Sequence, residues 1–139
     1  METIIESIKI FLENCPLINK EINVDYLPEE PLEYSIIPIP TKPVIKSYVD
    51  GSTRKQYAFI VCSREYYGDD IKQLLKNVGF YEKLSNWIED KNKSGDFPLL
   101  PDGMEALKLS VVNSGYLYNE EKDNAIYQIE CNLIYMERT

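Results

Sequence analysis

The first helical pattern of apolar residues lies at the start of the chain. Apolar residues recur there at spacings of three and four, which predicts an amphipathic helix over residues 3–15. Thr3 and Glu6 have the spacing of a capping box, and Pro16 is expected to end the helix because it disfavours helical geometry in the residue before it. The apolar face comprises Ile4, Ile5, Ile8, Phe11, Leu12 and Cys15.

A second helical pattern covers residues 69–94. Asp69 and Asp70 at its start suit the positive end of a helix dipole. Two apolar stripes follow, and Gly79 between them predicts a kink or two helices that meet at an angle. The first stripe comprises Ile71, Leu74, Leu75 and Val78, and the second comprises Leu84, Trp87 and Ile88.

Strand patterns occupy the middle of the chain. Residues 43–50 predict a short strand and residues 54–64 a longer one, and the turn residues 50–53 join them as a hairpin. The longer strand is apolar on both faces, so we expect it to be central in its sheet. One face carries Tyr57, Phe59 and Val61, and the other carries Ala58, Ile60 and Cys62.

Two further strands are predicted near the end of the chain, over about residues 105–118 and 124–136, after a proline-rich loop from Phe97 to Gly103. The polar residues 119–123 form the turn between them. The last strand alternates cleanly, which predicts one buried face and one opposite face. The buried face comprises Ala125, Tyr127, Ile129, Cys131, Leu133 and Tyr135, and Gln128, Glu130 and Asn132 face away.

The region between the first helix and the first hairpin is rich in proline. Residues 17–33 are expected to be a connector, and residues 34–40 an edge strand or an extended arm, because proline cannot donate a ladder hydrogen bond. The predicted order is α-β-β-β-α-β-β. We therefore expect one α+β domain over residues 1–139, with a mainly antiparallel sheet of four to five strands and helices packed on it.

Charge and cysteine content narrow the classes of partner. The net charge of −8 disfavours binding to nucleic-acid phosphates. Each of the three cysteines lies among apolar residues and no C-x-x-C pair is present, which predicts reduced, buried thiols. The first residues lack the pattern of a signal peptide, and no apolar stretch has the length of a membrane span, so we expect a protein made in the cytoplasm without a membrane partner.

Candidate chemistry is sparse. The chain has no histidine, which excludes a Ser-His-Asp or Cys-His pair within it and disfavours a zinc site. We expect no enzyme activity, no cofactor and no metal. A hydrolase that uses paired carboxylates is the remaining enzymatic alternative. The carboxylates have simpler roles in the connector, at the helix start and in the turn: Glu29, Glu30 and Glu33; Asp69 and Asp70; Glu120, Glu121 and Asp123.

Tyrosine is abundant, with 11 copies. Tyr66 and Tyr67, and also Tyr116 and Tyr118, fall near the ends of predicted elements, where side chains can reach solvent. Tyrosine is enriched at protein interfaces because it joins a large apolar area to a hydroxyl group. These side chains could also pack in or over the sheet.

Several segments resemble small proteins from tail-assembly clusters of phages and prophages of Gram-positive bacteria, variously labelled minor capsid or tail terminator proteins. The similarity extends from about residue 26 to residue 135. The segments that carry it are Glu30–Ser35, Asp50–Tyr57, Ser63–Gly68, Gly79–Glu82 and Trp87–Glu89.

The resemblance implies an α/β fold and a ring, typically sixfold, on the head-proximal end of a tail tube. Such a ring stops tube polymerisation and offers a docking surface to a head or neck, or forms the collar of a headless, phage-tail-like bacteriocin. The implied partners are further copies of the chain, tube and sheath proteins, and a head–neck connector where a capsid exists. The protein would pass from the bacterial cytoplasm into the particle.

Two regions are expected to make the contacts between subunits or with partners. The first is the segment from Tyr26 to Pro40, whose apolar residues need burial; it could equally fold back on its own sheet. The second runs from Arg64 to Asp70, because Arg and Tyr dominate interface hot spots. The candidate contact residues are Tyr34, Ile36, Ile37, Ile39, Arg64, Tyr66, Tyr67 and Asp69. The alternative function is a monomeric cytoplasmic adaptor or inhibitor that binds another protein.

Overall fold

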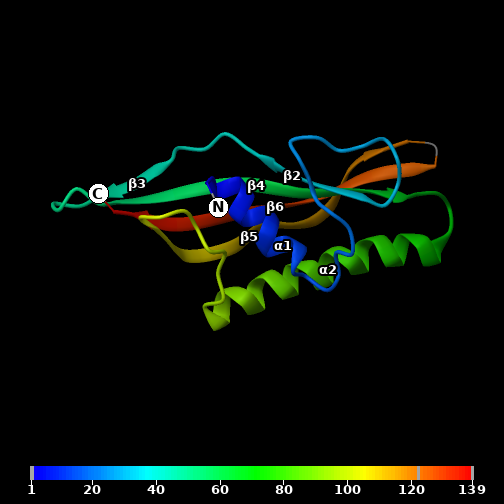
Figure 1. Ribbon diagram of the computed structural model, residues 1–139. Coiled ribbons are helices and arrows are strands. Elements are labelled where there is room, and N and C mark those ends of the chain that lie inside the picture. The colour runs from blue at the N-terminus through cyan, green and yellow to red at the C-terminus, as the bar shows by residue number, and fades with distance from the viewer. Residues whose placement is uncertain (1, 122, 139) are drawn as a thin grey trace.

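The computed structural model describes residues 2–121 and 123–138. Within these residues the chain forms an α+β domain with two helices and six strands (Figure 1). The elements follow the order α1 (Ile4–Glu13), β1 (Asn23–Val24), β2 (Glu33–Pro38), β3 (Val44–Ser47), β4 (Thr53–Tyr66), α2 (Ile71–Ser94), β5 (Met104–Glu120) and β6 (Asn124–Glu137).

The strands form one mixed sheet in the order β1-β2-β4-β6-β5, and β3 also pairs with β4. The β1–β2 pair is parallel, and the other pairs are antiparallel. In Figure 1 α2 runs along one side of the sheet with α1 beside it. The rings of Phe11 in α1 and Trp87 in α2 lie 5.1 Å apart, so both helices cover the same face. The opposite face lacks a covering helix within the described residues.

The central position of the 54–64 strand is confirmed. β4 pairs with β2 and β3 on one side and with β6 along its whole length on the other. Its Phe59 and Val61 are buried under the helices, as is the predicted core face of β6. The two hairpins are also confirmed: β3 pairs with β4, and β5 pairs with β6. In the turn between β5 and β6, Lys122 lies outside the described residues.

The prolines of residues 34–40 do not produce an arm. β2 pairs with β4 over six positions from Glu33 to Pro38, and β1 lies on its other side. Proline is tolerated here because Pro38 is the last residue of the strand. The alternative, in which this segment folds back on its own sheet, is therefore correct. Sequence reasoning missed β1, because two residues are too few to show an alternating pattern.

The capping box of α1 forms only in part. The Thr3 hydroxyl accepts a hydrogen bond from the Glu6 backbone N–H at 3.2 Å, as predicted. The Glu6 carboxylate instead accepts one from the Glu2 backbone N–H at 3.1 Å. The helix ends at Glu13, before the predicted limit, because Asn14 already serves as its C-cap.

The expectation of two helices that meet at Gly79 is wrong, and three of the four residues in the first apolar stripe of α2 are exposed. The helix is continuous from Ile71 to Ser94. Its buried face comprises Asn77, Tyr81, Leu84 and Ile88, so the second predicted stripe is buried only at Leu84 and Ile88, with Trp87 half-buried. A polar anchor lies on the sheet side of the first half: the Asn77 amide donates to the Tyr66 carbonyl at 2.8 Å and accepts from the Gln73 amide at 2.8 Å. Ile71, Leu75 and Val78 consequently face solvent.

The three cysteines are free and buried, as predicted. Burial raises the pKa of Cys62 to about 11 and that of Cys131 to about 12, and it also raises the pKa of Cys15. Thiolate is the reactive form of cysteine. The native thiols should therefore react slowly, because they are buried and because their raised pKa values leave little thiolate at neutral pH. We expect a thiol reagent to label the native protein at pH 7.5 more than tenfold more slowly than protein unfolded in urea. Rapid labelling of all three native thiols would contradict the assigned core faces.

Candidate interaction surfaces

The segment from Tyr26 to Pro40 divides its predicted contact residues between two faces. Tyr34 and Ile36 point under the helices and are buried in the core, so they cannot contact a partner unless the domain unfolds. The structure therefore corrects their assignment. Ile37 and Ile39 lie on the opposite face, where they are half-buried. The alternation of side chains along β2 produces this division.

Ile37 and Ile39 line a groove of about 450 Å³ on the helix-free face of the sheet. We name it the sheet groove. Its lining is mainly apolar, and Glu130 is its charged residue among the described side chains. The other lining residues come from the connector and from β4, β5 and β6: Leu27, Ile60, Cys62, Tyr118, Ile126 and Gln128. Residues far apart in the sequence thus form one apolar surface.

Arg64 is a structural residue of this fold and not an exposed anchor. Its side chain is only 9% exposed. The guanidinium donates to the Pro28 carbonyl at 2.9 Å and to the Asn124 side-chain oxygen at 2.8 Å, and Glu121 lies 3.9 Å away. These bonds hold the connector against the end of β4. The assignment of Arg64 as a surface contact is therefore corrected, because its side chain is buried and hydrogen-bonded within the chain.

Tyr66, Tyr67 and Asp69 remain accessible at the end of β4. Tyr66 and Asp69 are exposed, and Tyr67 is half-exposed. Tyr67 and Asp69 line an open hollow with Gly68, Leu74, Glu120 and Glu121. A hydrogen bond with Glu120 raises the pKa of Tyr67. This end of the molecule therefore presents an acidic, partly aromatic surface.

Glu65, next to Arg64, points under α2 and is buried with one carboxylate oxygen unpartnered. Burial raises its pKa above the usual 4.5, although a hydrogen bond with Ser63 opposes the shift. A raised carboxyl pKa favours folding when the group is protonated, and this stabilisation is lost as pH rises above 4.5 through the folded pKa.

Glu65→Gln should remove this loss of stability. We expect the variant to be more stable than the wild type at pH 7 by about 1 kcal/mol, and the difference to vanish near pH 4. Urea unfolding at the two pH values measures this difference. Glu29→Gln, which replaces an exposed carboxylate, is the matched control. The burial argument would be contradicted if Glu65→Gln stabilised the protein less at pH 7 than at pH 4, each compared with the wild type at the same pH.

The first half of α2 exposes most of the apolar stripe that its sequence carries. Ile71, Leu75 and Val78 are 71%, 68% and 57% exposed. Their spacing of four and three residues places them in one row along the helix. Lys72, Lys76 and Lys83 form a parallel row beside it, and all three are exposed. We name this surface the α2 stripe: an apolar row with a basic flank.

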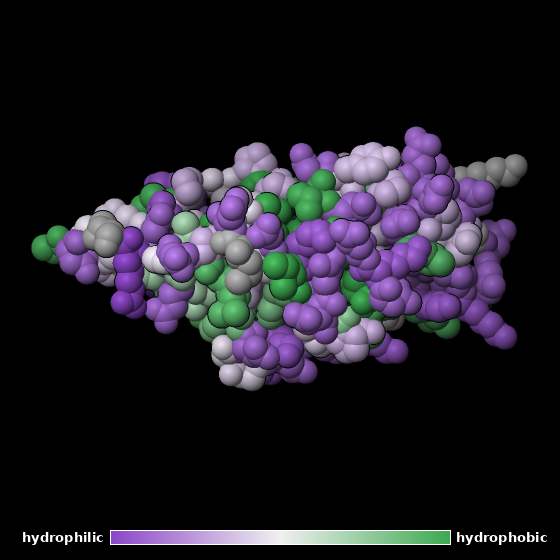
Figure 2. All heavy atoms as spheres, viewed as in Figure 1, coloured by the Kyte–Doolittle hydropathy of each residue, from purple (hydrophilic) through white to green (hydrophobic). Residues whose placement is uncertain are grey.

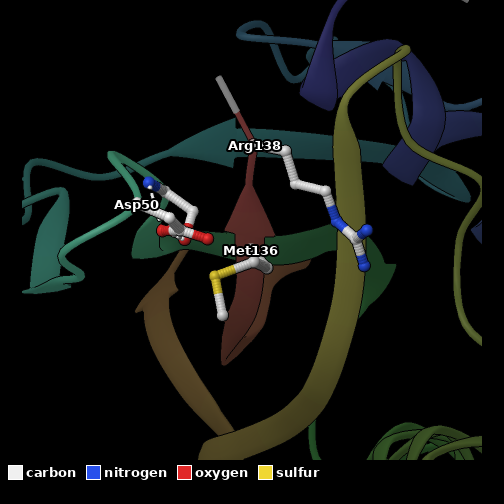
Figure 3. Close-up of a pocket in the computed structure, with 4 residues that line it drawn as sticks. Asp50, Met136 and Arg138 are labelled. Carbon is white, nitrogen blue, oxygen red and sulfur yellow. Dashed lines mark hydrogen bonds between the residues drawn. The ribbon is translucent and has the colours of Figure 1, made fainter.

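A third hollow, with a volume of about 410 Å³, lies at the end of the sheet where β4 begins and β6 ends, away from Tyr66 and Tyr67 (Figure 3). Asp50 and Ser52 line it from the β3–β4 turn, and Met136 and Arg138 from the end of β6. Figure 3 shows the Arg138 side chain directed away from Asp50. Asp50 accepts hydrogen bonds from the Ser52 backbone and hydroxyl, which lower its pKa, and Arg138 pairs with Glu105 at 3.0 Å. These groups already have partners within the chain.

Neither protein-family models nor curated proteins match this sequence. Among the described side chains, no group of three or more Cys, Asp and Glu has the arrangement of a metal site. No helix in the described part of the chain is long and apolar enough to cross a membrane.

Figure 2 shows how the surface is composed on one side of the molecule. Hydrophobic spheres reach the surface over its middle, between larger hydrophilic areas. The sheet groove and the α2 stripe each have this composition on a smaller scale.

Proposed function

We propose that this protein is a structural component of a phage or phage-like tail. It caps the head-proximal end of the tail tube as a homo-oligomeric ring, expected to be sixfold. The ring ends tube polymerisation and forms the collar or the head-docking surface. In this proposal the chain acts by binding protein surfaces, without cofactor or catalysis, first in the bacterial cytoplasm and then in the particle, which is a phage or a contractile, headless bacteriocin.

The observation that carries the proposal is the pair of uncovered apolar surfaces on a folded domain. The α2 stripe places three large aliphatic side chains in solvent, each more than half exposed. The sheet groove adds a second apolar surface on the other face. Apolar patches rimmed by charged residues are typical of protein interaction sites. A ring requires two different surfaces on each subunit, because its contacts are head-to-tail.

The resemblance to tail terminators supplies the kind of assembly. Two of its segments, Ser63–Gly68 and Gly79–Glu82, flank the first half of α2 and so lie next to the α2 stripe in the chain. The net charge of −8 supports protein partners over nucleic acid. The head or neck, the tube and the sheath are the partners that this role would require.

Tube growth in the presence of the protein tests the proposal. The tube protein encoded in the same tail-assembly cluster would be polymerised alone and with increasing amounts of this protein. Electron microscopy would then measure the length distribution. We expect shorter tubes that stop growing, with the mean length falling as the ratio of this protein to tube protein rises. An unchanged length distribution at a tenfold molar excess would contradict the capping role and favour a monomeric binding module.

A further inference from the structure

The two uncovered apolar surfaces differ in shape and in charge. The α2 stripe is a convex helix face with the basic flank Lys72, Lys76 and Lys83. The sheet groove is concave, and Glu130 is the charged side chain described in its lining. Glu29 and Glu30 are exposed in the connector close to Leu27, which also lines the groove. The stripe therefore has a lysine flank, with the exposed Glu82 one turn beyond Val78 in the same row, and the groove has an acidic side.

We propose that the α2 stripe of one copy docks in the sheet groove of the next copy. Ile71, Leu75 and Val78 have the i, i+4, i+7 spacing with which a helix enters an apolar groove. The lysine flank would then face the acidic side of the groove. This inference rests on the proposed ring and deepens it, since it assigns both halves of the subunit contact.

Local charge favours a second copy as the occupant. Two copies, each with a net charge of −8, repel each other overall, but the lysine flank of the stripe and the Glu130 side of the groove carry opposite charges and attract each other locally. The stripe and the groove belong to opposite sides of the sheet, which gives a head-to-tail contact. A contact of this type leaves one stripe and one groove free on each dimer, so that further copies add until a ring closes.

Two variants separate the halves of the contact. Leu75→Asp places a carboxylate in the stripe, and Tyr118→Lys places an ammonium group in the groove. Both positions are more than 60% exposed, so neither substitution enters the core. Val49→Asp at the tip of the β3–β4 hairpin is the matched control, because Val49 is fully exposed and lies outside both surfaces. Circular dichroism and urea unfolding would confirm that all three variants fold.

Analytical ultracentrifugation of the full chain, over a range up to millimolar concentration, measures assembly. We expect the wild type and Val49→Asp to form rings, and each stripe or groove variant alone to remain monomeric, with at least a tenfold weaker association. An equimolar mixture of Leu75→Asp and Tyr118→Lys should form dimers and nothing larger, because the mixture contains one intact stripe–groove pair. Lys76→Glu should weaken assembly, and Glu130→Lys in a partner copy should restore it in part.

Each other outcome overturns the inference. A wild type that stays monomeric throughout excludes a second copy as the occupant in solution. Assembly of Leu75→Asp or Tyr118→Lys at wild-type affinity shows that the corresponding surface is not the contact. The tube-growth assay separates this from the proposed function. If Leu75→Asp forms rings and caps tubes, the stripe–groove inference fails and the capping function stands. If rings form through the stripe and the groove but do not shorten tubes, the capping function fails and the stripe–groove inference stands.

Discussion

Gly115→Ala is expected to lower the free energy of unfolding by about 2 kcal/mol, within the range for overpacked sites. Gly115 in β5 faces α2, and an added Cβ would overlap the Cβ and ring of Tyr81. The Tyr81 Cβ cannot move away by a rotamer change, because it is fixed to the helix backbone. The helix or the strand must therefore shift, and the packing around Tyr81 is lost. Urea unfolding monitored by circular dichroism measures the effect.

Gly79→Ala is the matched control for this variant. Gly79 lies in the interior of α2, and nothing lies within 4 Å of the position that a Cβ would take. Alanine there should raise stability by about 0.5–1 kcal/mol, because it has the higher helix propensity. The same substitution thus has opposite signs at the two positions. Equal stability of Gly115→Ala and the wild type would contradict the close approach of α2 and β5.

Tyr81→Phe is expected to cost about 1–3 kcal/mol of stability, because it leaves buried polar groups without a partner. The Tyr81 hydroxyl lies 2.6 Å from the Ser63 hydroxyl and donates to the Tyr127 carbonyl at 3.0 Å. Tyr81 and Ser63 are fully buried, and Tyr127 nearly so. Removal of one oxygen therefore breaks both bonds, with water unable to replace them.

Two comparison variants define this effect. Ser63→Ala alone should also lower stability, because it removes the partner of the Tyr81 hydroxyl and the hydrogen bond that Ser63 makes with Glu65. Tyr26→Phe, at an exposed tyrosine, should change stability by less than about 0.5 kcal/mol. Thermal and urea unfolding of the four proteins would show the pattern. A Tyr81→Phe protein as stable as the wild type would show that this bond pair does not hold α2 to the sheet.

The sheet was largely predictable from the sequence because its signals are local. The alternation in residues 124–136 and the two-faced apolar pattern in residues 54–64 identify β6 and β4, and their short polar turns require antiparallel neighbours. The two residues of β1 carry no such signal. For residues 34–40 the sequence could not decide between an arm and a paired strand, because prolines at the end of β2 leave the earlier residues free to pair.

The orientation of α2 was not predictable, because a tertiary hydrogen bond decides it. Hydrophobic spacing favours burial of Ile71, Leu75 and Val78, but the Asn77 bond to the Tyr66 carbonyl holds Asn77 on the face toward the sheet, and the other three side chains are exposed. A partner in the sheet cannot be identified from the spacing of residues within the helix. The same limitation applies to Arg64, whose acceptors lie 36 and 60 residues away along the chain.

The candidate contact residues were predictable only where exposure follows from strand alternation. Ile37 and Ile39 share a face that the helices leave uncovered, whereas Tyr34 and Ile36 point the other way. The remainder of the sheet groove comes from β4, β5 and β6, which meet these residues only after folding. Among the described residues, the exposure of the first apolar stripe of α2 has the larger consequence for function, because spacing alone does not show which side of the helix meets the sheet.

The most direct test of the capping role is to locate the protein on tail tubes. The chain would carry a gold label on a cysteine introduced at Val49, which is fully exposed at the β3–β4 turn and outside both proposed contact surfaces. Labelled protein would be mixed with preformed tubes and viewed by negative-stain electron microscopy. The account predicts a cluster of labels, about six, at one end of each tube. Labels along the tube wall, at both ends or absent from the tubes would contradict it.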